Sequence, residues 1–390
     1  MTDLVAGDVG SDPVRAWSGD GVDALRTEVR DFCESARLEG EFTPRCDAWL
    51  ASSSPEFSRA LARKGWVGMT WPRRYGGHGR SAVERLVVAE ELLAAGAPVA
   101  AHWIADRQSG PQIHRHGSEA LRERFLPAIA RGECYFSLGM SEPESGSDLA
   151  SVRTRARPID GGWILNGTKV WTSHAHHSHF ITVLCRTEDA GDDPHEGLSI
   201  LVVDLSTPGV TVRPIRLITG EHHFNEVIFE DARVPGEMVL GEPGDGWRLV
   251  TAELSLERSG PERFLSTFPL FAALVEVLGP GADDRGATAV GELAAELMAL
   301  RRLSFEVAAS IDAGSDPATQ AAIVKDLGTR FEGHVAEVAR TLLPARPALD
   351  AIAPFDRLLA EAVLSAPGFT LRGGTNEILR GIVARDLGVR

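Results

Sequence analysis

The chain has 390 residues and a mass of 41.9 kDa, which is more than one hydrophobic core usually supports, so we expect two or three packed subdomains. Apolar residues make up 43% and charged residues 24%, a balance that is typical of globular enzymes and excludes a disordered chain. Forty basic and 55 acidic residues give a formal charge of −15, which disfavours nucleic acid and anionic membranes as partners.

The cysteines and the first residues indicate the compartment. The four cysteines are scattered and contain no Cys-x-x-Cys pair, so neither a zinc site nor a disulfide framework is predicted. Residues 1–20 have no apolar stretch of signal-peptide length, and the longest later apolar run, over 268–278, is interrupted by Glu276. We therefore expect a cytoplasmic protein without a targeting or membrane-spanning segment.

The first part of the chain is predicted to be helical. Residues 1–20 are polar and rich in glycine, which is typical of a flexible tail. Over residues 21–133 apolar side chains recur at helical spacing, beginning with Val22, Leu25 and Val29. This pattern predicts an N-terminal helical domain.

The period changes over residues 134–245, where short runs of β-branched and apolar residues alternate with Gly, Pro, Asp and His. This composition predicts a β-barrel-like middle domain. Within it, Asn166-Gly167 separates two apolar runs, and this dipeptide tolerates the positive φ angles of a tight turn, so we expect a hairpin there.

Helical periodicity returns over residues 246–390, most clearly over 290–312, 319–343 and 356–364. The last third is therefore predicted to be a four-helix bundle, and the fold class is mainly α with a central β-domain. No Gly-x-Gly-x-x-Gly follows a predicted strand, which disfavours a Rossmann dinucleotide site.

Two segments of the middle domain carry side chains suited to a flat cofactor. The first, residues 138–149, is a strand that runs into a loop of small residues whose amides and hydroxyls can cradle a polar ligand, although such loops are also common as plain turns. The second is Trp171-Thr172-Ser173, in which an indole can lie against a conjugated ring and a hydroxyl can bond a ring heteroatom. A strand tryptophan is also commonly a core residue.

Two segments of the last third complete the set. Glu253 and Glu257 lie four residues apart and share one helix face, and Pro261 bends or ends that helix; a solvated acidic face is the alternative. Near the C-terminus, Gly373-Gly374 precede Thr375 and Asn376, either of which is a good N-cap for an amphipathic helix with Ile378, Ile382, Val383 and Leu387 expected inward.

In this order, the four segments resemble the acyl-CoA dehydrogenase family from about residue 20 to the C-terminus. Supporting matches are Gly65-Trp66, Trp71-Pro72, Tyr75-Gly76-Gly77, Phe125-Leu126-Pro127, Arg131-Gly132-Glu133, Phe224-Asn225-Glu226-Val227 and Val234-Pro235. The resemblance implies FAD bound without a Rossmann fold, an acyl-CoA substrate, α,β-desaturation, and electron transfer to a carrier such as an electron-transfer flavoprotein.

The resemblance also assigns roles position by position. It implies that Met140 and Ser141 meet the flavin edge and that Ser147 lies near the FAD pyrophosphate and the CoA. Trp171 would pack on the isoalloxazine, next to Thr172 and Ser173, with Ser173 where a Thr usually bonds flavin N5. The remaining flavin contacts implied by the resemblance are Thr375 and Glu377.

The catalytic base departs from the commonest family pattern. Many members carry the base directly before a Gly-Thr of the terminal segment, where this chain has Gly373. Other members carry it on the earlier helix directly before an Arg, which corresponds here to Glu257-Arg258. We therefore expect Glu257 as base and Arg258 as a substrate contact, with Glu253 and Glu262 as alternatives that are otherwise solvated.

A second departure concerns assembly. The Arg-x-x-Phe-Gly and Gln-x-x-Gly-Gly motifs with which family members reach the adenine half of FAD in a neighbouring subunit are missing near Arg285 and residues 351–354. This resembles heteromeric steroid-type dehydrogenases, so we expect a homo- or hetero-oligomer with a related subunit. A non-catalytic or half-site subunit, and a flavin oxidase or monooxygenase on the same scaffold, are the alternatives.

Two further clusters have weaker functional interpretations. His174, His176, His177 and His179 follow the predicted hairpin, where a solvent-exposed turn is favoured over a metal site because no carboxylate accompanies them. Trp103, Asp106 and Arg107 fall where the family lines the acyl cavity, which indicates an acyl group other than a plain alkyl chain, with surface placement as the alternative.

Overall fold

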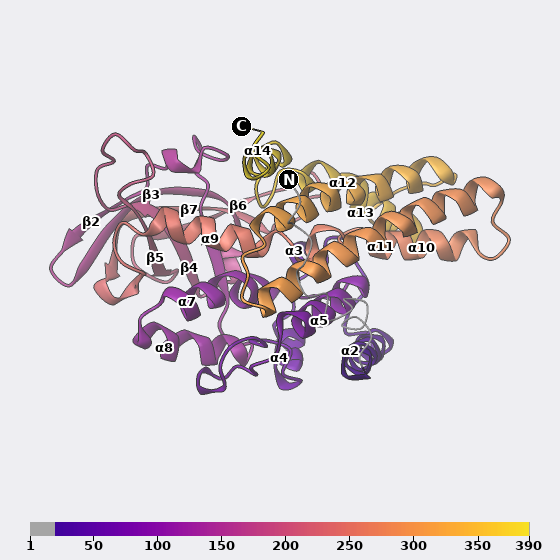
Figure 1. The fold of residues 1–390 in the computed structure, drawn as a ribbon, viewed down its shortest axis with the longest axis horizontal. Coiled ribbons are helices and arrows are strands. Elements are labelled where there is room, and N and C mark those ends of the chain that lie inside the picture. Colours follow the sequence, from indigo (N-terminus) through magenta and orange to yellow (C-terminus); the bar gives the residue numbers. More distant parts are fainter. Residues whose placement is uncertain (1–19, 390) are drawn as a thin grey trace, which may run out of the picture.

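The computed structural model describes residues 20–389, except for the side chains of residue 20 and residues 253–257, so the predicted tail lies outside the described residues. The first part is helical, as predicted, and occupies the lower half of Figure 1. Its elements are α2 (Asp20–Leu38), α3 (Ala48–Ala51), α4 (Pro55–Arg63), η1 (Arg73–Tyr75), α5 (Ala82–Ala94), α6 (Ala100–Ile104), the π-helix η2 (Ala105–Ser109), α7 (Gly110–His116) and α8 (Glu119–Ala130).

The middle of the chain forms one eight-stranded sheet in the order β6-β7-β3-β2-β4-β5-β8, with β1 added in parallel to β4. Short 3-10 turns η3 (Leu149–Ser151), η4 (Ala175–His177) and η5 (Gly236–Met238) connect its strands. The strands are β1 (Phe136–Gly139), β2 (Arg155–Ile159), β3 (Gly162–Ser173), β4 (Phe180–Arg186), β5 (Leu198–Asp204), β6 (Val210–Ile215), β7 (Phe224–Pro235) and β8 (Val239–Leu240).

The hairpin predicted at Asn166-Gly167 is wrong. The turn lies at Asp160-Gly161, because Ile159 of β2 pairs with Gly162 of β3, and β3 then continues through Asn166 and Gly167. The register against β7 shifts at this point, which marks a bulge. Gly167 is required there because a Cβ would lie 2.4 Å from Thr154 Oγ1, so close backbone packing, not a chain reversal, explains this glycine.

The last third is helical. In chain order the β-domain therefore lies between two helical parts, which confirms the predicted fold class (Figure 1). In the last helix, α14 (Asn376–Asp386), the prediction that Ile378 and Leu387 point inward is wrong, because these side chains are 44% and 69% exposed. Leu379 is fully buried instead, on the face that packs against α12. The elements are α9 (Gly246–Glu257), η6 (Pro261–Arg263), α10 (Phe268–Leu278), α11 (Asp284–Asp312), α12 (Ala318–Leu342), α13 (Pro354–Phe369) and α14 (Asn376–Asp386).

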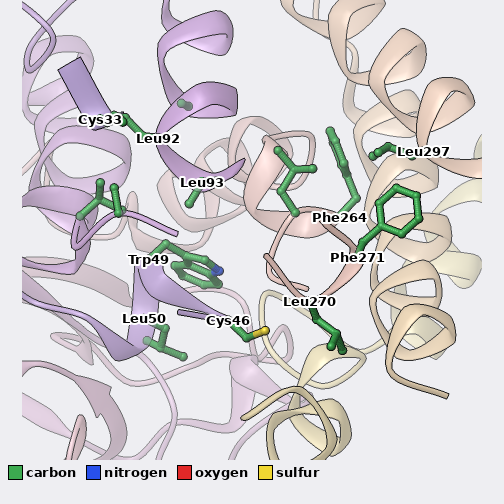
Figure 2. Packing of buried hydrophobic residues seen from close by; sticks show 14 of the residues in the cluster. Cys33, Cys46, Trp49, Leu50, Leu92, Leu93, Phe264, Leu270, Phe271 and Leu297 are labelled. Atoms are coloured by element: carbon green, nitrogen blue, oxygen red, sulfur yellow. The ribbon is translucent and has the colours of Figure 1, made fainter. Parts of the chain in front are cut away.

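A single hydrophobic core joins the first and last helical parts (Figure 2). Cys46 and Trp49 from the first part face Phe264 and Leu270 from the last, and a second core fills the space between the sheet and helices α7 and α8. All four cysteines are buried free thiols. Within the described residues, no helix is long and apolar enough to span a membrane.

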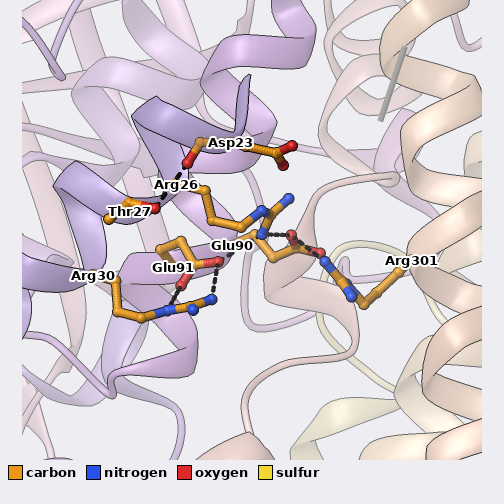
Figure 3. A network of polar contacts seen from close by, with 7 residues as sticks. All are labelled: Asp23, Arg26, Thr27, Arg30, Glu90, Glu91 and Arg301. Carbon is orange, nitrogen blue, oxygen red and sulfur yellow. Dashed lines mark hydrogen bonds and ion pairs between the residues drawn. The ribbon is translucent and has the colours of Figure 1, made fainter. Parts of the chain in front are cut away.

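Ion pairs reinforce the contact between the two helical parts (Figure 3). Glu90 of α5 accepts hydrogen bonds from Arg26 of α2 and from Arg301 of α11, each at 2.6 Å. Glu91 binds Arg26 at 2.6 Å and Arg30 at 3.1 Å. Both carboxylates are buried and have guanidinium partners, which meets the requirement for a stable buried charge. Helix α5 is therefore fixed between its neighbours.

Candidate active site

The first two candidate segments meet where β1 ends beside β3. The backbone N–H of Val170 donates to the carbonyl of Ser141 at 2.9 Å, and the Lys169 ammonium donates to the carbonyl of Met140 at 2.9 Å. Met140 and Ser141 therefore lie directly beside the strand that continues into Trp171. The structure therefore brings the two segments together at one place on the sheet.

A buried ion pair, absent from the sequence-based prediction, holds this junction. The Lys169 ammonium, 0% exposed, donates to Glu142 Oε1 at 2.8 Å, and Glu142 also accepts the backbone N–H groups of Arg153 and Thr154. Burial alone would raise the pKa of Glu142, but Lys169 and these hydrogen bonds outweigh it and hold that pKa below its usual value. The sequence offered one indication of this ion pair: Lys169 is one of only three lysines in the chain and lies within a predicted apolar run.

Trp171 occupies a second bulge of β3. Between Lys169 and Thr172 the strand gains a residue relative to β7, and Trp171 has a φ of +58°, the left-handed conformation that non-glycine residues adopt rarely. Its indole is 58% exposed and meets Phe224 edge-on, at 6.0 Å between ring centroids. The core alternative for Trp171 is therefore wrong. The bulge leaves a large aromatic face exposed.

The two hydroxyls after Trp171 differ in exposure. Thr172 is fully buried, and its Oγ1 has no hydrogen-bond partner within residues 20–389. Ser173 is half-buried at the end of β3. Ser147 lies exposed in the loop after β1, where the Ser145 hydroxyl donates to the carbonyl of Asp148 at 2.6 Å and shapes the turn. An indole face, exposed hydroxyls and loop amides suit a flat conjugated ligand with a polar tail.

The terminal candidate segment begins with two glycines in left-handed conformation, Gly373 at a φ of +69° and Gly374 at +89°. The Thr375 hydroxyl then accepts the N–H of Ile378 and caps α14, as predicted, while Glu377 is exposed in the first turn. Asn376 is buried and accepts from the Lys325 ammonium at 2.8 Å. Thr375 and Glu377 thus lie at an accessible helix start that Asn376 anchors to α12.

The turn after α9 lies directly against these glycines. A Cβ on Gly373 would lie 2.8 Å from the guanidinium of Arg263, and a Cβ on Gly374 would lie 3.6 Å from that of Arg258. Arg258 and Arg263 are both buried. The space that a residue 373 side chain would need is therefore filled from the segment that follows α9. Glu257 is the last residue of α9, and its side chain, like that of Glu253, lies outside the described residues.

Glu262 is not the solvated residue that we expected. It is 1% exposed, and its carboxylate accepts from Arg107 at 3.4 Å. The surface alternative for the Trp103 segment is also wrong, because Trp103 and Asp106 are buried and the Arg107 guanidinium lies 5.1 Å from the centroid of the Trp103 ring. These contacts lie in the interior because η2 packs against both β1 and α9.

The histidine cluster is only partly exposed, in contrast to the solvent-exposed turn that we predicted. His174 is 7% exposed, its Nε2 lies 2.7 Å from the carbonyl oxygen of Leu50, and burial lowers its pKa to about 4. His176 stacks on His222 at 4.0 Å, whereas His177 and His179 are exposed. No group of three or more metal-ligating side chains occurs in the described part of the chain. The buried His174 ring is therefore neutral near pH 7 and packs at the end of β3.

One glycine controls how closely α12 approaches the turn after α9. A Cβ on Gly328 would lie 2.4 Å from the carbonyl oxygen of Arg263. We expect Gly328→Ala to force α12 and η6 apart and to lower the free energy of unfolding by about 1–3 kcal/mol, measured by urea denaturation. Gly333→Ala is the matched control, because its Cβ meets no atom within 4 Å. Equal stability of the two variants would contradict the close contact.

Comparison with known proteins identifies the family. Models of the acyl-CoA dehydrogenase N-terminal, middle and C-terminal domains match residues 20–133, 137–232 and 280–388. Acyl-CoA dehydrogenase FadE29 of Mycobacterium tuberculosis is 36% identical over 371 residues, which cover 92% of this chain and 94% of that protein. IpdE1 of the same organism is 40% identical over 243 residues, 61% of this chain and 63% of that protein.

Solved structures of heteromeric enzymes are similar over nearly the whole chain. The Tcur3481-Tcur3483 steroid ACAD superposes with a TM-score of 0.81 at 26% identity, covering 95% of this chain and 98% of that one. The ChsE4-ChsE5 complex from Mycobacterium tuberculosis superposes with a TM-score of 0.79 at 28% identity, covering 96% of this chain and 98% of that one. Together with the three domain matches, these similarities show that the chain belongs to the acyl-CoA dehydrogenase family of oxidoreductases, whose members normally bind FAD.

Proposed function

We propose that this chain is an FAD-binding subunit of an acyl-CoA dehydrogenase that desaturates the Cα–Cβ bond of an acyl-CoA thioester with Glu257 as the base. Glu257 takes the α-proton while the β-carbon gives up a hydride, so that one proton and one hydride leave as the double bond forms; bound FAD would supply the hydride acceptor. Hydrogen-bond donors at the thioester oxygen stabilise the charge that develops as the α-proton departs. Arg258 and Ser147 are the proposed substrate contacts.

The position of Glu257 at the end of α9, just before the turn that contacts the terminal glycines, supports this assignment. The Arg263 guanidinium fills the side-chain space at Gly373, which has no group that could accept a proton. Arg258, the neighbour of Glu257, is buried against Gly374. Arg258 and Arg263, which follow Glu257 in the chain, thus reach the glycines of the other family position, and of the two positions only residue 257 is a carboxylate in this chain.

The residues around β3 fit the cofactor that the family normally binds. The exposed Trp171 indole offers a face for the isoalloxazine, and its bulge keeps it out of the core. Ser173 and the segment of Met140 and Ser141 would contact the ring edge. Thr172, with a buried hydroxyl that lacks a partner in the described structure, would lie under it. The accessible start of α14, with Thr375 and Glu377, would complete the flavin contact.

A related second subunit is part of the proposal. Apolar side chains on and before α14 are exposed in the single chain, among them Leu371 at 62% and Leu387 at 69%. The motifs that would reach the adenine half of FAD are missing from this sequence. We propose that a related chain covers this surface and completes the cofactor site, and that a cytoplasmic electron-transfer flavoprotein or a similar carrier accepts the electrons.

Anaerobic reduction tests the activity. The chain, co-purified from its host with any companion subunit, should be yellow and should bleach when an acyl-CoA substrate is added without oxygen. A colourless complex would favour the second candidate, a non-catalytic subunit. A reduced flavin that reacts rapidly with oxygen would favour an oxidase or monooxygenase on the same scaffold. Bleaching followed by reoxidation with an electron-transfer flavoprotein is the expected result.

Expression without a companion tests the assembly. We expect the chain alone to contain clearly less than one FAD per subunit, measured from the flavin-to-protein absorbance ratio, because half of the cofactor site is missing. Addition of the companion subunit should restore the ratio to about one. Stoichiometric, tightly held FAD in the chain alone would contradict the shared site while leaving the proposed dehydrogenation intact.

A further inference from the structure

A small cationic pocket lies between α5, η2 and the turn after α9. Its polar lining consists of Arg85, Arg107, Ser259, Gly260 and Ser304, and apolar side chains of α5 and α11 close the rest. The cavity volume is about 20 Å³, which is enough for one small polar group. Two guanidinium groups thus face a space that is lined otherwise by hydroxyls, backbone and apolar atoms.

The neighbouring carboxylates do not neutralise both arginines. Asp106 accepts the backbone N–H of Gly68 at 2.7 Å, and Glu262 accepts from Arg107 at a long 3.4 Å. Asp312, at the rim, accepts the N–H groups of Ala82 and Val83. The carboxylates of Asp106 and Asp312 therefore accept backbone N–H groups, and the carboxylate of Glu262 accepts from Arg107.

Arg85 is the unsatisfied member of the pair. Its Nε is buried and has no hydrogen-bond partner within the described residues, and no ion pair to Arg85 occurs there. Burial, and then the positive charge of Arg107, lower the pKa of Arg85 to about 10, while Asp106 and Glu262 oppose this change. Arg85 as a whole is half-buried, and a guanidinium whose buried Nε has no acceptor favours an anionic guest in the pocket.

The pocket lies beside the proposed reaction site. Ser259 and Gly260 follow Glu257 by two and three residues, and Arg107 belongs to η2, which packs against both α9 and β1. The Arg107 guanidinium lies over the Trp103 ring, on the segment predicted to line the acyl cavity. An acyl group that starts at Glu257 and runs along η2 would bring its far end to Arg85 and Arg107.

From this geometry we propose that Arg85 and Arg107 bind a carboxylate at the far end of the acyl group, so that the substrate class is acyl-CoA thioesters that carry a second carboxylate. This inference rests on the proposed dehydrogenation and deepens it. A guanidinium pair suits a carboxylate because planar, charge-assisted hydrogen bonds form with both oxygens. Ser259 and Ser304 add neutral hydroxyls at the pocket wall.

Matched thioesters test the inference in the flavin-loaded complex. The probes are adipoyl-CoA against hexanoyl-CoA and suberoyl-CoA against octanoyl-CoA, which differ within each pair only in the terminal carboxylate. We expect kcat/KM for anaerobic flavin reduction to be about tenfold or more higher for the carboxylated member of at least one pair. Equal values, or a preference for the uncharged members, would overturn this inference alone. Failure of all four probes to reduce the flavin would instead count against the proposed dehydrogenation.

Variants separate recognition from a structural role. Arg85→Met should abolish the preference for the carboxylated probe and leave kcat/KM for its uncharged partner within about threefold, whereas Arg85→Lys should retain part of the preference. Arg302→Gln, which removes an exposed arginine on the neighbouring α11, is the matched control. An unchanged preference in Arg85→Met would overturn the assignment.

The thermal midpoint without ligand provides a second readout. Arg85→Met removes a half-buried charge that forms no ion pair within the described residues, so the ligand-free midpoint should rise or stay constant, and adipate should stabilise the wild-type protein but not this variant. An arginine that only supported the fold would give a lower midpoint in the variant. A lower midpoint together with a preserved preference for the carboxylated probes would overturn the inference.

Discussion

Replacing Glu257 with Gln is expected to leave FAD bound and to slow anaerobic flavin reduction by about 10²–10⁴-fold, the range that a positioned general base contributes. The amide keeps the size and hydrogen-bonding capacity of the side chain but cannot accept the α-proton. The measurement is the rate of bleaching in a stopped-flow mixer under saturating acyl-CoA. The flavin content of the purified variant, read from its visible spectrum, shows that the loss concerns the proton transfer and not the cofactor.

Glu253→Gln is the matched control, since it removes a carboxylate one turn earlier on the same helix. We expect this variant to retain most of the activity. Full activity in Glu257→Gln would discard the base assignment.

A carboxylate placed at the other family position should not restore activity, because the Arg263 guanidinium fills the space beside Gly373. The double variant Glu257→Gln with Gly373→Glu should therefore stay inactive.

Lys169→Met is expected to have the largest effect on stability. It removes the cation that pairs with the buried Glu142 at 2.8 Å and also the donor to the Met140 carbonyl. Breaking a buried ion pair by removing one partner costs about 3–5 kcal/mol, because the remaining charge is left uncompensated. Urea denaturation at neutral pH measures this loss as a lower midpoint. Weaker FAD binding should accompany it, since Met140 ends the strand that meets the proposed flavin edge.

Lys64→Met is the matched control for that loss. Lys64 is 43% exposed and pairs with the exposed Glu28 at 3.3 Å, so its removal should cost less than about 1 kcal/mol. Lys169→Met combined with Glu142→Gln should recover part of the stability, because the double variant no longer buries a lone charge. Equal unfolding midpoints of the two single lysine variants would contradict the importance of the pair.

The pH dependence of this difference follows from Glu142. Lys169 and the hydrogen bonds hold the folded-state pKa of Glu142 below its usual value of 4.5, against the opposite effect of burial. The stability that Glu142 contributes is therefore present above pH 4.5 and is lost as the pH falls through the folded-state pKa. The gap between wild type and Lys169→Met should be full at neutral pH and should narrow in acid.

The candidate site shows where prediction from sequence ends. The four candidate segments were recognisable because each is a short run of residues in a local pattern, and the structure brings Met140, Ser141 and Trp171 together. The Lys169–Glu142 pair was missed because its partners are 27 residues apart and no local pattern links Glu142, in the segment 138–149, to Lys169. The burial of Glu262 was missed for a similar reason, since Arg107 reaches it from another domain.

The sequence by itself determined the order of helical, β and helical parts, the end of α9 ahead of Pro261 and the start of α14 near Thr375 and Asn376, because these depend on residues close together in the chain; the structure chose Thr375 as the cap. Only the tertiary structure decided that Asn166-Gly167 is a bulge, because the deciding contact is the approach of Thr154 to Gly167 from a neighbouring segment. It also decided that Arg263 fills the space at Gly373 and that Arg85 and Arg107 share a pocket. Such contacts join residues far apart in sequence, and their geometry is set by packing, which no local pattern encodes.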